Sequence, residues 1–343
     1  MPSSKIRMPA FILLATAVGA IVFALIAVAQ IDYLFFAGYV VLQFVVLATA
    51  WNILGGYCGY VNFGSAAFFA CGAYTAVALH KFDGAIDDLF GDGALSSALH
   101  AIFPLPIPVL VVIAGIASGL IGLGTGYLTL RLRGAFFSIA TLALAVVLQT
   151  LVVNWDYVGG SRGAYIIRAQ SLDVFGTTLP YVQYLFLLKL VLVVLVIATA
   201  RAIEHSRLGF GFATIRDDEL AAEASGVPTL RLKLIATTLS GAFMGMAGAP
   251  FPYFIGYLQP SSAFGLEYAV NSIAMPMIGG TTSWLGPLIG AVLLGSAQQY
   301  ATVTISSAVN LLIVGLMLVG FVIIAPNGLV GLVQERLRAR KRS

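Results

Sequence analysis

Apolar residues recur along this chain in blocks of about 20 positions, and short polar segments separate the blocks. A block such as 107–130 is apolar on every side, whereas strands of a membrane β-barrel alternate apolar and polar residues over about 10 positions. A helix of about 20 residues crosses a hydrocarbon core roughly 30 Å thick. The pattern predicts an all-α, polytopic transmembrane bundle of about ten spans, at 9–29, 33–54, 61–80, 107–130, 135–153, 182–200, 234–256, 265–279, 286–303 and 308–325.

The composition agrees with this pattern. Of the 343 residues, 60% are hydrophobic and 9% are charged, whereas an ordinary soluble domain carries roughly 25% charged residues. A soluble fold is therefore excluded. The net charge of +4 could indicate a nucleic-acid partner, but the basic residues are sorted by loop, so we expect membrane lipid and no nucleic acid.

The distribution of basic residues predicts the orientation. Fourteen of the 18 basic residues lie in the terminal segments and in loops that the ten-span map places on the same side. The positive-inside rule then puts both termini in the cytoplasm and requires an even number of spans. The sequence from Lys5 to Ala29 imitates a cleavable signal peptide, but its apolar stretch is longer than the 7 to 15 residues that are typical of one. We expect a retained first helix.

Two glycine-rich segments interrupt the apolar pattern: Gly55–Gly59, the first glycine turn, and Gly279–Pro287, the second glycine turn. Helices broken at membrane depth face protein or water, and in corresponding positions of two halves they indicate a transport site. If the chain consists of two halves of five spans each, the odd number inverts the second half relative to the first. The residues carry no strong internal repeat, so this arrangement stays open within a single domain of residues 1–343.

The long inner loop, 201–233, is the only substantial cytoplasmic segment that the map places between spans. Residues Asp217–Ser225 are typical of a short helix with acidic residues in its first turn, which the helix dipole favours. Gly226 and Pro228 end this helix. One apolar face can be formed by Leu220, Ala221 and Ala224. Taken alone, the segment is most simply interpreted as a solvated helix at the membrane surface.

No pattern of catalysis is present in the sequence. None of the lysines follows a glycine, which excludes a Walker A motif, and no GxSxG motif or Ser-His-Asp grouping stands out. The three histidines are far apart, and the two cysteines, Cys58 and Cys71, lie in apolar, glycine-rich sequence. Neither a metal site nor a disulfide is predicted. We expect a transport subunit without catalytic residues or a cofactor of its own.

Several segments together resemble a known family. Ser206-Arg207-Leu208-Gly209 and Ile215–Gly226 are similar to the coupling loop of membrane permeases from branched-chain amino acid ABC importers of the Liv type. Other segments match this family in the correct order along the chain. They are Gly56–Gly59 with Phe63-Gly64, Ala66–Phe69 and Gly72–Tyr74, then Leu130–Gly134, Asn154-Trp155 with Gly159-Gly160, Gly279-Gly280 with Gly286-Pro287, and Pro326–Leu329.

The resemblance implies an inner-membrane permease that pairs with a second related permease, two ATP-binding subunits and an extracytoplasmic solute-binding protein. ATP and magnesium would be bound by the ATP-binding subunits, and this chain would carry branched-chain amino acids or related small polar or amphipathic solutes. The family likeness also implies a set of residues that couples the permease to an ATPase. These are Arg216, Asp217, Asp218, Glu219, Leu220, Ala221, Ala222, Glu223, Ala224 and Gly226.

The chain departs from the family pattern in both glycine-rich segments. Near the first, it has Tyr60, Asn62 and Ser65, where the family commonly has Gln, Ser and His or Gln. In the second, it has Thr282 where a glycine is usual. These departures bear on the substrate, and related permeases that import urea, short amides or aromatic acids remain alternatives. We expect a set of neutral polar residues to line the solute path, although hydrogen bonding between helices is an alternative role for each. The set is Tyr60, Asn62, Ser65, Thr141, Gln149, Asn271 and Ser272.

An ion-coupled secondary transporter is the competing class. Such transporters usually place charged or ion-coordinating groups in the middle of the membrane. Here the charges within predicted spans are Lys189 and Glu267, both within about two helical turns of an outer end, where a lysine side chain reaches the surface easily. Anchoring or local pairing therefore explains both residues, and the ABC permease is favoured.

Overall fold

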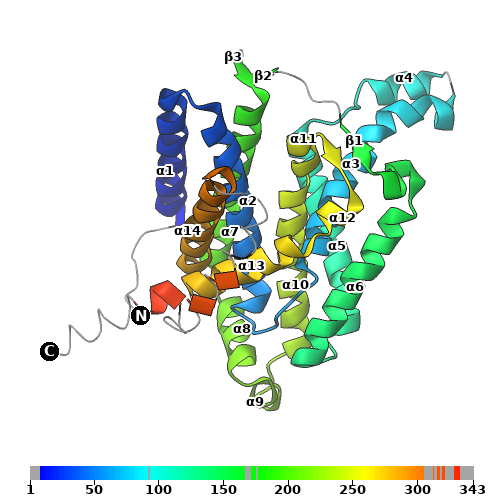
Figure 1. Cartoon of the computed structure of the whole chain (residues 1–343). Coiled ribbons are helices and arrows are strands. Elements are labelled where there is room, and N and C mark those ends of the chain that lie inside the picture. The colour runs from blue at the N-terminus through cyan, green and yellow to red at the C-terminus, as the bar shows by residue number, and fades with distance from the viewer. Residues whose placement is uncertain are drawn as a thin grey trace. The chain divides into compact units, whose positions relative to one another are not determined.

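The computed structural model describes residues 8–91, 93–166, 171–174, 177–304, 312, 315–316, 319–320 and 328–332. This described part is mainly helical (Figure 1). Within it, six helical segments are long and apolar enough to cross a membrane: α1 (Met8–Ala29), α2 (Asp32–Gly55), α5 (Ile107–Thr129), α6 (Ala135–Val153), α7 (Tyr181–Glu204) and Thr229–Ile255. The last comprises α10 (Thr229–Gly248) and α11 (Phe251–Ile255). The prediction of a polytopic helical bundle is confirmed.

Three more predicted spans are also helices. They are α3 (Ser65–Phe90), α13 (Leu266–Gly279) and α14 (Leu285–Thr304). With 14 residues, α13 is only about 21 Å long at 1.5 Å per residue, which is shorter than a hydrocarbon core. The predicted span 308–325 lies mostly outside the described residues.

The segments between the spans are more ordered than the sequence suggests. The polar stretch 81–105 separates the predicted spans 61–80 and 107–130, yet it contains the last turns of α3 and the helix α4 (Ala94–His100). The stretch 154–181 holds the short helices η1 (Asp156–Val158) and η2 (Gly160–Arg162) and three strands. Strand β1 (Ala164–Tyr165) pairs antiparallel with β4 (Tyr257–Leu258), and β2 (Ser171–Val174) pairs with β3 (Thr177–Pro180). The remaining helices are α8 (Arg207–Asp217), α9 (Glu219–Ala224) and α12 (Pro260–Ala263).

The fold divides into two compact units. Unit 1 takes its described residues from 1–61, 171–233 and 270–343, and unit 2 takes them from 62–170 and 234–269. Each unit therefore combines segments from early and late parts of the chain. The units do not coincide with a first and a second half of five spans, and the inverted halves stay a prediction.

The core of unit 1 is formed by α2, which packs against α7 and α14. Helix α1 packs on α7, where Phe23 lies 6.1 Å from Phe186 between ring centroids. Phe11 is the one residue of α1 that is buried, and the rest of the helix presents apolar side chains outward. This exposure is expected of a helix that faces lipid, and the retention of the first helix stays a prediction.

Unit 2 is built on close contacts between small residues. An added Cβ atom at Gly72 of α3 would lie 2.1 Å from the backbone oxygen of Gly245 in α10. On α5, Ser118 is fully buried and its hydroxyl donates to the backbone oxygen of Phe68 at 3.1 Å. Small residues let membrane helices approach closely and gain dispersion contacts, because lipid leaves no hydrophobic drive between helices.

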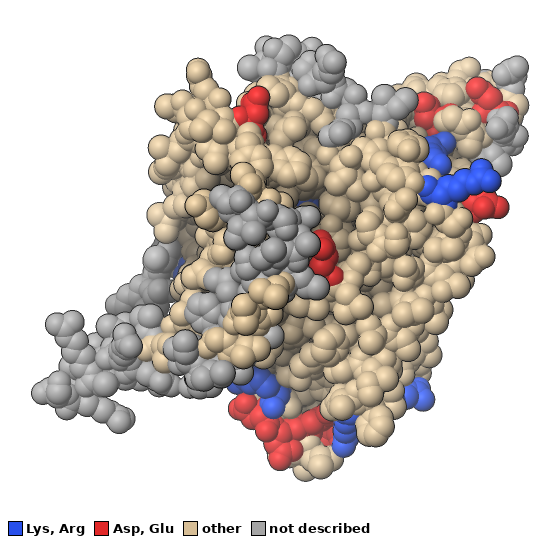
Figure 2. All heavy atoms as spheres, viewed as in Figure 1, with Lys and Arg blue, Asp and Glu red and all other residues tan. Residues whose placement is uncertain are grey.

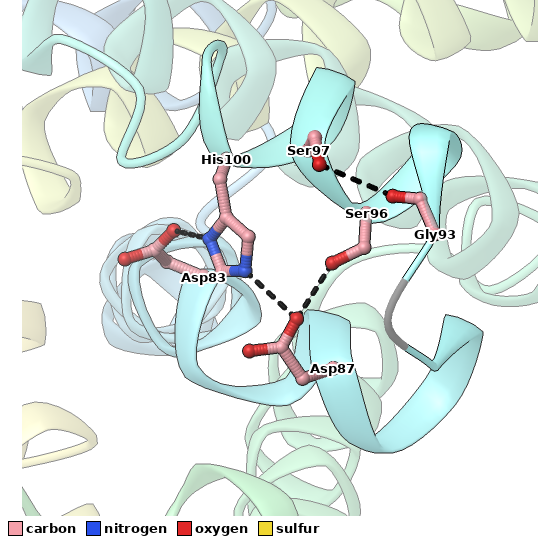
Figure 3. A network of polar contacts seen from close by, with 6 residues as sticks. All are labelled: Asp83, Asp87, Gly93, Ser96, Ser97 and His100. Carbon is pink, nitrogen blue, oxygen red and sulfur yellow. Dashed lines mark hydrogen bonds and ion pairs between the residues drawn. The ribbon is translucent and has the colours of Figure 1, made fainter.

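One polar cluster, which we name the His100 cluster, joins the end of α3 to α4 in unit 2 (Figure 3). The His100 ring nitrogens lie 3.0 Å from carboxylate oxygens of Asp83 and Asp87, and the Ser96 hydroxyl donates to Asp87 at 2.6 Å. An ionised carboxylate only accepts, so both contacts require a proton on each ring nitrogen. The hydrogen bonds to Asp87 and Asp83 accordingly raise the pKa of His100 above its ordinary value of 6.5. Those from Ser96 and His100 hold the pKa of Asp87 below its ordinary 3.8.

The stability of α4 is expected to depend on pH. Because the folded-state pKa of His100 is raised, its contribution is complete below pH 6.5 and is lost as pH rises through the folded-state value. The contribution of Asp87 is present above pH 3.8 and is lost as pH falls below it. Hydrogen exchange, corrected for intrinsic rates, should show α4 more protected at mildly acidic than at alkaline pH. His100→Gln should remove this difference, and an unchanged difference in that variant would contradict the account.

Candidate functional site

Helix α8 occupies the inner loop where no helix was expected, and it follows directly from the end of α7. Its N-cap is Ser206, whose hydroxyl oxygen accepts a hydrogen bond from the backbone N–H of Gly209 at 3.3 Å. Phe212 and Ile215 are buried on one face of the helix, whereas Phe210 is 69% exposed on another. The helix is therefore amphipathic, with its inner face packed within unit 1.

Helix α9 begins at Glu219 rather than at the predicted Asp217, because Asp217 ends α8 and Asp218 caps α9. A carboxylate oxygen of Asp218 accepts from the N–H of Ala221 at 3.0 Å, as in a typical N-cap. At the other end, the backbone N–H of Gly226 donates to the backbone oxygen of Glu223, and the N–H of Val227 donates to the backbone oxygen of Ala222. This pattern is a Schellman motif, and Gly226 has a φ of +79° in it, which glycine adopts without strain.

The outward face of α9 is apolar at its centre and charged around it. Leu220 is 64% exposed, and Ala221 and Ala224 are exposed too, whereas Ala222 is buried. The predicted apolar face of Leu220, Ala221 and Ala224 therefore lies on the surface of unit 1. Figure 2 shows charged side chains gathered over α8 and α9 at the lower end of the view. Exposed charged residues of this segment are Arg207, Arg216, Asp217, Asp218 and Glu223.

Beneath this surface, three side chains from separate elements form a buried polar contact, which we name the Glu219 contact. The Lys233 Nζ donates to Glu219 Oε1 at 2.6 Å and to the Tyr60 hydroxyl at 3.1 Å. The same hydroxyl donates to Glu219 Oε2. The Lys233 and Glu219 side chains are 4% and 13% exposed. The contact therefore joins the start of α9 to the first turns of α10 and to the chain that follows the first glycine turn.

The first glycine turn also lies directly against α8. Gly59 has a φ of +80°, and a Cβ atom there would come within 3.0 Å of the Arg216 side chain. Both the backbone conformation and the space thus favour glycine at this position. Arg216 was predicted to contact an ATPase, and the structure places it beside this turn, with its guanidinium 3.2 Å from Asp217.

The second glycine turn lies at the same end of unit 1. The backbone N–H of Trp284 donates to Glu204 at the end of α7 at 2.9 Å. The Arg201 guanidinium lies 4.1 Å from the ring centroid of Phe11 in α1, and that ring meets the Trp284 ring edge to face at 5.0 Å. The two turns lie close together, because a Cβ atom at Gly56 of the first turn would come within 2.8 Å of the backbone oxygen of Thr281 in the second. Asn52, just before the first turn, donates its side-chain amide to the same oxygen at 3.1 Å.

Four of the predicted path residues lie in unit 2. Asn62 and Thr141 line the same small cavity. Both side chains accept a hydrogen bond from the backbone of Phe63-Gly64: Asn62 from the N–H of Gly64 at 2.7 Å, and Thr141 from the N–H of Phe63 at 3.2 Å. Ser65 is buried and Gln149 is half-buried. These contacts hold the chain between α2 and α3 against α6.

The other three, Tyr60, Asn271 and Ser272, lie in unit 1. Tyr60 belongs to the Glu219 contact, so its hydroxyl is hydrogen-bonded to Glu219 of α9 and to Lys233 of α10. Asn271 accepts a hydrogen bond from the buried Gln298 side chain at 2.8 Å, and Ser272 is fully buried beside it in sequence. The path residues are therefore divided between the two units, and their shared role stays a prediction.

The two charges within predicted spans have different environments. Lys189 was expected to reach the membrane surface, but its side chain is fully buried, with Nζ 5.2 Å from the ring centroid of Tyr39. Glu267 lies in the first turn of α13 and is exposed, where the helix dipole favours an acidic residue. Local contacts within unit 1 thus surround Lys189, in line with the pairing that the sequence left open.

Comparison with known proteins identifies the family. Residues 34–322 match the family described as branched-chain amino acid transport system / permease component. The chain belongs to this family of permeases. This permease is 27% identical over 319 residues to the high-affinity branched-chain amino acid transport system permease protein LivM of Salmonella typhimurium, a match that covers 87% of the chain and 70% of that protein.

The permease also resembles other members. It is 25% identical over 296 residues to the probable branched-chain amino acid transport permease protein LivH of Methanocaldococcus jannaschii, which covers 81% of the chain and 85% of that protein. It is 28% identical over 215 residues to the ribose import permease protein RbsC of Escherichia coli, covering 59% of the chain and 64% of that protein. No solved structure matches the chain. The protein is thus a multi-pass membrane permease of the ABC importer type.

Three residues of the site, Lys233, Glu204 and Trp284, were not predicted from the sequence. Lys233 is one of the 14 basic residues on the predicted cytoplasmic side. A lysine at the start of an apolar span is a signal that a polar or acidic side chain pairs with it. No local signal indicated that this partner is Glu219, 14 positions earlier and across a turn. Trp284 lies among the glycines of the second turn, where a large aromatic side chain indicates a packing contact.

Proposed function

We propose that this permease imports branched-chain amino acids or related small solutes as part of an ABC importer, and that α9 is its docking element for an ATP-binding subunit. The main support is the structure of α9. This short, capped helix is held on its buried side by the Glu219 contact, and its outer side exposes Leu220, Ala221 and Ala224. Exposed apolar patches with a polar rim are typical of protein interaction sites.

The proposal extends to the rest of the complex. A second related permease, two ATP-binding subunits that hold ATP and magnesium, and an extracytoplasmic solute-binding protein would complete it. With both termini in the cytoplasm, α8 and α9 face the ATP-binding subunits, and α4 with the His100 cluster faces the binding protein. The basic residues of the inner loops support this orientation.

The substrate assignment rests on the relatives. LivM and LivH are named for branched-chain amino acids, whereas RbsC is named for ribose. The family match and the coverage of LivM favour amino acids for this chain. Urea, short amides or aromatic acids are the alternatives, and the pathway residues Asn62, Ser65 and Thr141 are where we expect the choice to be made.

Uptake into proteoliposomes tests the proposal. The permease is reconstituted with a candidate partner permease and candidate ATP-binding subunits, and loaded binding protein is supplied outside. We expect labelled leucine, isoleucine or valine to enter only when ATP is enclosed, and ionophores that dissipate ion gradients to have no effect. Uptake that needs an ion gradient and proceeds without ATP would instead identify a secondary transporter. Uptake of urea or an aromatic acid in preference to leucine would overturn the substrate assignment.

A further inference from the structure

The Glu219 contact occupies an unusual place in the chain. Tyr60 lies one residue before the chain leaves unit 1 at position 61, and Lys233 is the residue at which it leaves unit 1 a second time. The chain passes between the units at four points, after residues 61, 170, 233 and 269. The Glu219 carboxylate of α9 is therefore hydrogen-bonded to Tyr60 and Lys233, which lie next to two of these four passages.

The chemistry of the contact suits the transfer of a displacement. A buried ion pair with both partners hydrogen-bonded is stiff, because separating the partners leaves charges without solvent. Here Lys233 also lies 4.7 Å from the ring centroid of Tyr60, which adds a cation–π contact to the two hydrogen bonds.

We propose that Glu219, Lys233 and Tyr60 transmit the movement of α9 to the two passages that lead from unit 1 into α3 and into the main part of α10. In this role the three residues are positioning residues that link α9 to the two passages, and they do not contact the solute. Glu219 is the first residue of α9, so a displacement of this helix moves its carboxylate with it. Lys233 and Tyr60 follow because each is bonded to it, and the chain beyond each of them belongs to unit 2.

This inference rests on the proposed docking of α9, and the variants are chosen to separate the two. Glu219→Gln with Lys233→Met removes both charges together, so that neither is left buried without a partner. Tyr60→Phe removes only the hydroxyl. The exchange Glu219→Lys with Lys233→Glu restores an ion pair with reversed direction. As a matched control, Tyr157→Phe removes a hydroxyl that donates to the Ala78 backbone oxygen at 2.9 Å in unit 2.

The readout is the ratio of ATP hydrolysis with and without loaded binding protein, together with uptake, in complexes shown to be fully assembled. We expect the ratio to fall by roughly tenfold toward one in the doubly neutral variant, a size within the range that is typical of coupling between sites. Tyr60→Phe should give a smaller fall, the exchange should recover part of the ratio, and Tyr157→Phe should leave it unchanged.

Different failures have different meanings. If the wild-type chain does not assemble with ATPase subunits, or if its uptake does not need ATP, the proposed function itself is wrong. If the wild-type complex is coupled and the doubly neutral variant keeps the same ratio, only the transmission role is wrong. A structural role alone would lower the amount of assembled complex in the variants, while the ratio measured per complex would remain at the wild-type value.

Discussion

The variant Ala221→Trp is expected to abolish solute-stimulated ATP hydrolysis and uptake while the helices still insert in the membrane. Ala221 is exposed on the apolar face of α9, and its small side chain allows a close approach. An indole ring there would keep a partner several ångströms away, and each 1.4 kcal/mol of docking free energy that is lost weakens binding about tenfold. Uptake in proteoliposomes and the stimulation of hydrolysis by loaded binding protein measure the effect.

The matched control is Ala143→Trp, which places the same side chain at an exposed alanine of α6, a predicted membrane span. This variant should retain coupling. Normal uptake and normal stimulation in Ala221→Trp would show that α9 is only a solvated surface helix. A second variant, Ala221→Gly with Ala222→Gly, weakens the helix itself by roughly 1 kcal/mol per glycine and should give a partial loss.

The second large effect is expected from Gly290→Ala in α14. An added Cβ atom at Gly290 would lie 1.9 Å from the backbone oxygen of Met275 in α13, and a backbone atom cannot move aside as a side chain does. Overpacking of this kind costs typically 1 to 3 kcal/mol, and more where the backbone is involved. We expect little folded protein, a lower unfolding temperature and no uptake.

Gly295→Ala provides the control in the same helix. A Cβ atom at Gly295 would meet Val41 at 3.5 Å, an ordinary van der Waals distance. Alanine also has a higher helix propensity than glycine by about 1 kcal/mol, so this variant should be as stable as the wild type or more so. Equal unfolding temperatures for the two variants would contradict the close approach of α13 and α14.

Hydrophobic pattern and turn residues predicted the helices well, because burial in lipid and helix termination are local properties. The end of α9 at Gly226 is an example, because a glycine two positions before a proline is a typical helix stop and this glycine adopts the left-handed conformation. Helix α8 was missed because Gly209 and Gly211 lower its helix propensity, and packing of Phe212 and Ile215 overrides that cost.

The extension of α3 was missed for a related reason. Lys81, Asp83 and Asp87 end the apolar pattern and suggest a loop, but the helix continues, and contacts with α4 stabilise it through His100. The Glu219 contact could not be predicted either, because Tyr60 and Glu219 are 159 positions apart and share no periodic pattern. Such non-local pairs depend on the tertiary fold, and the sequence instead suggested that Tyr60 lines the solute path.

Cross-linking at position 221 tests the central claim most directly, namely that α9 docks on an ATP-binding subunit. A photoreactive benzophenone side chain is introduced at Ala221 and, in a separate variant, at Ala143 of α6; both positions are exposed. Irradiation of the assembled complex should join the chain to an ATP-binding subunit from position 221 and not from position 143. Absence of this product at position 221 in a complex that still hydrolyses ATP on stimulation, or equal products from both positions, would contradict the docking of α9.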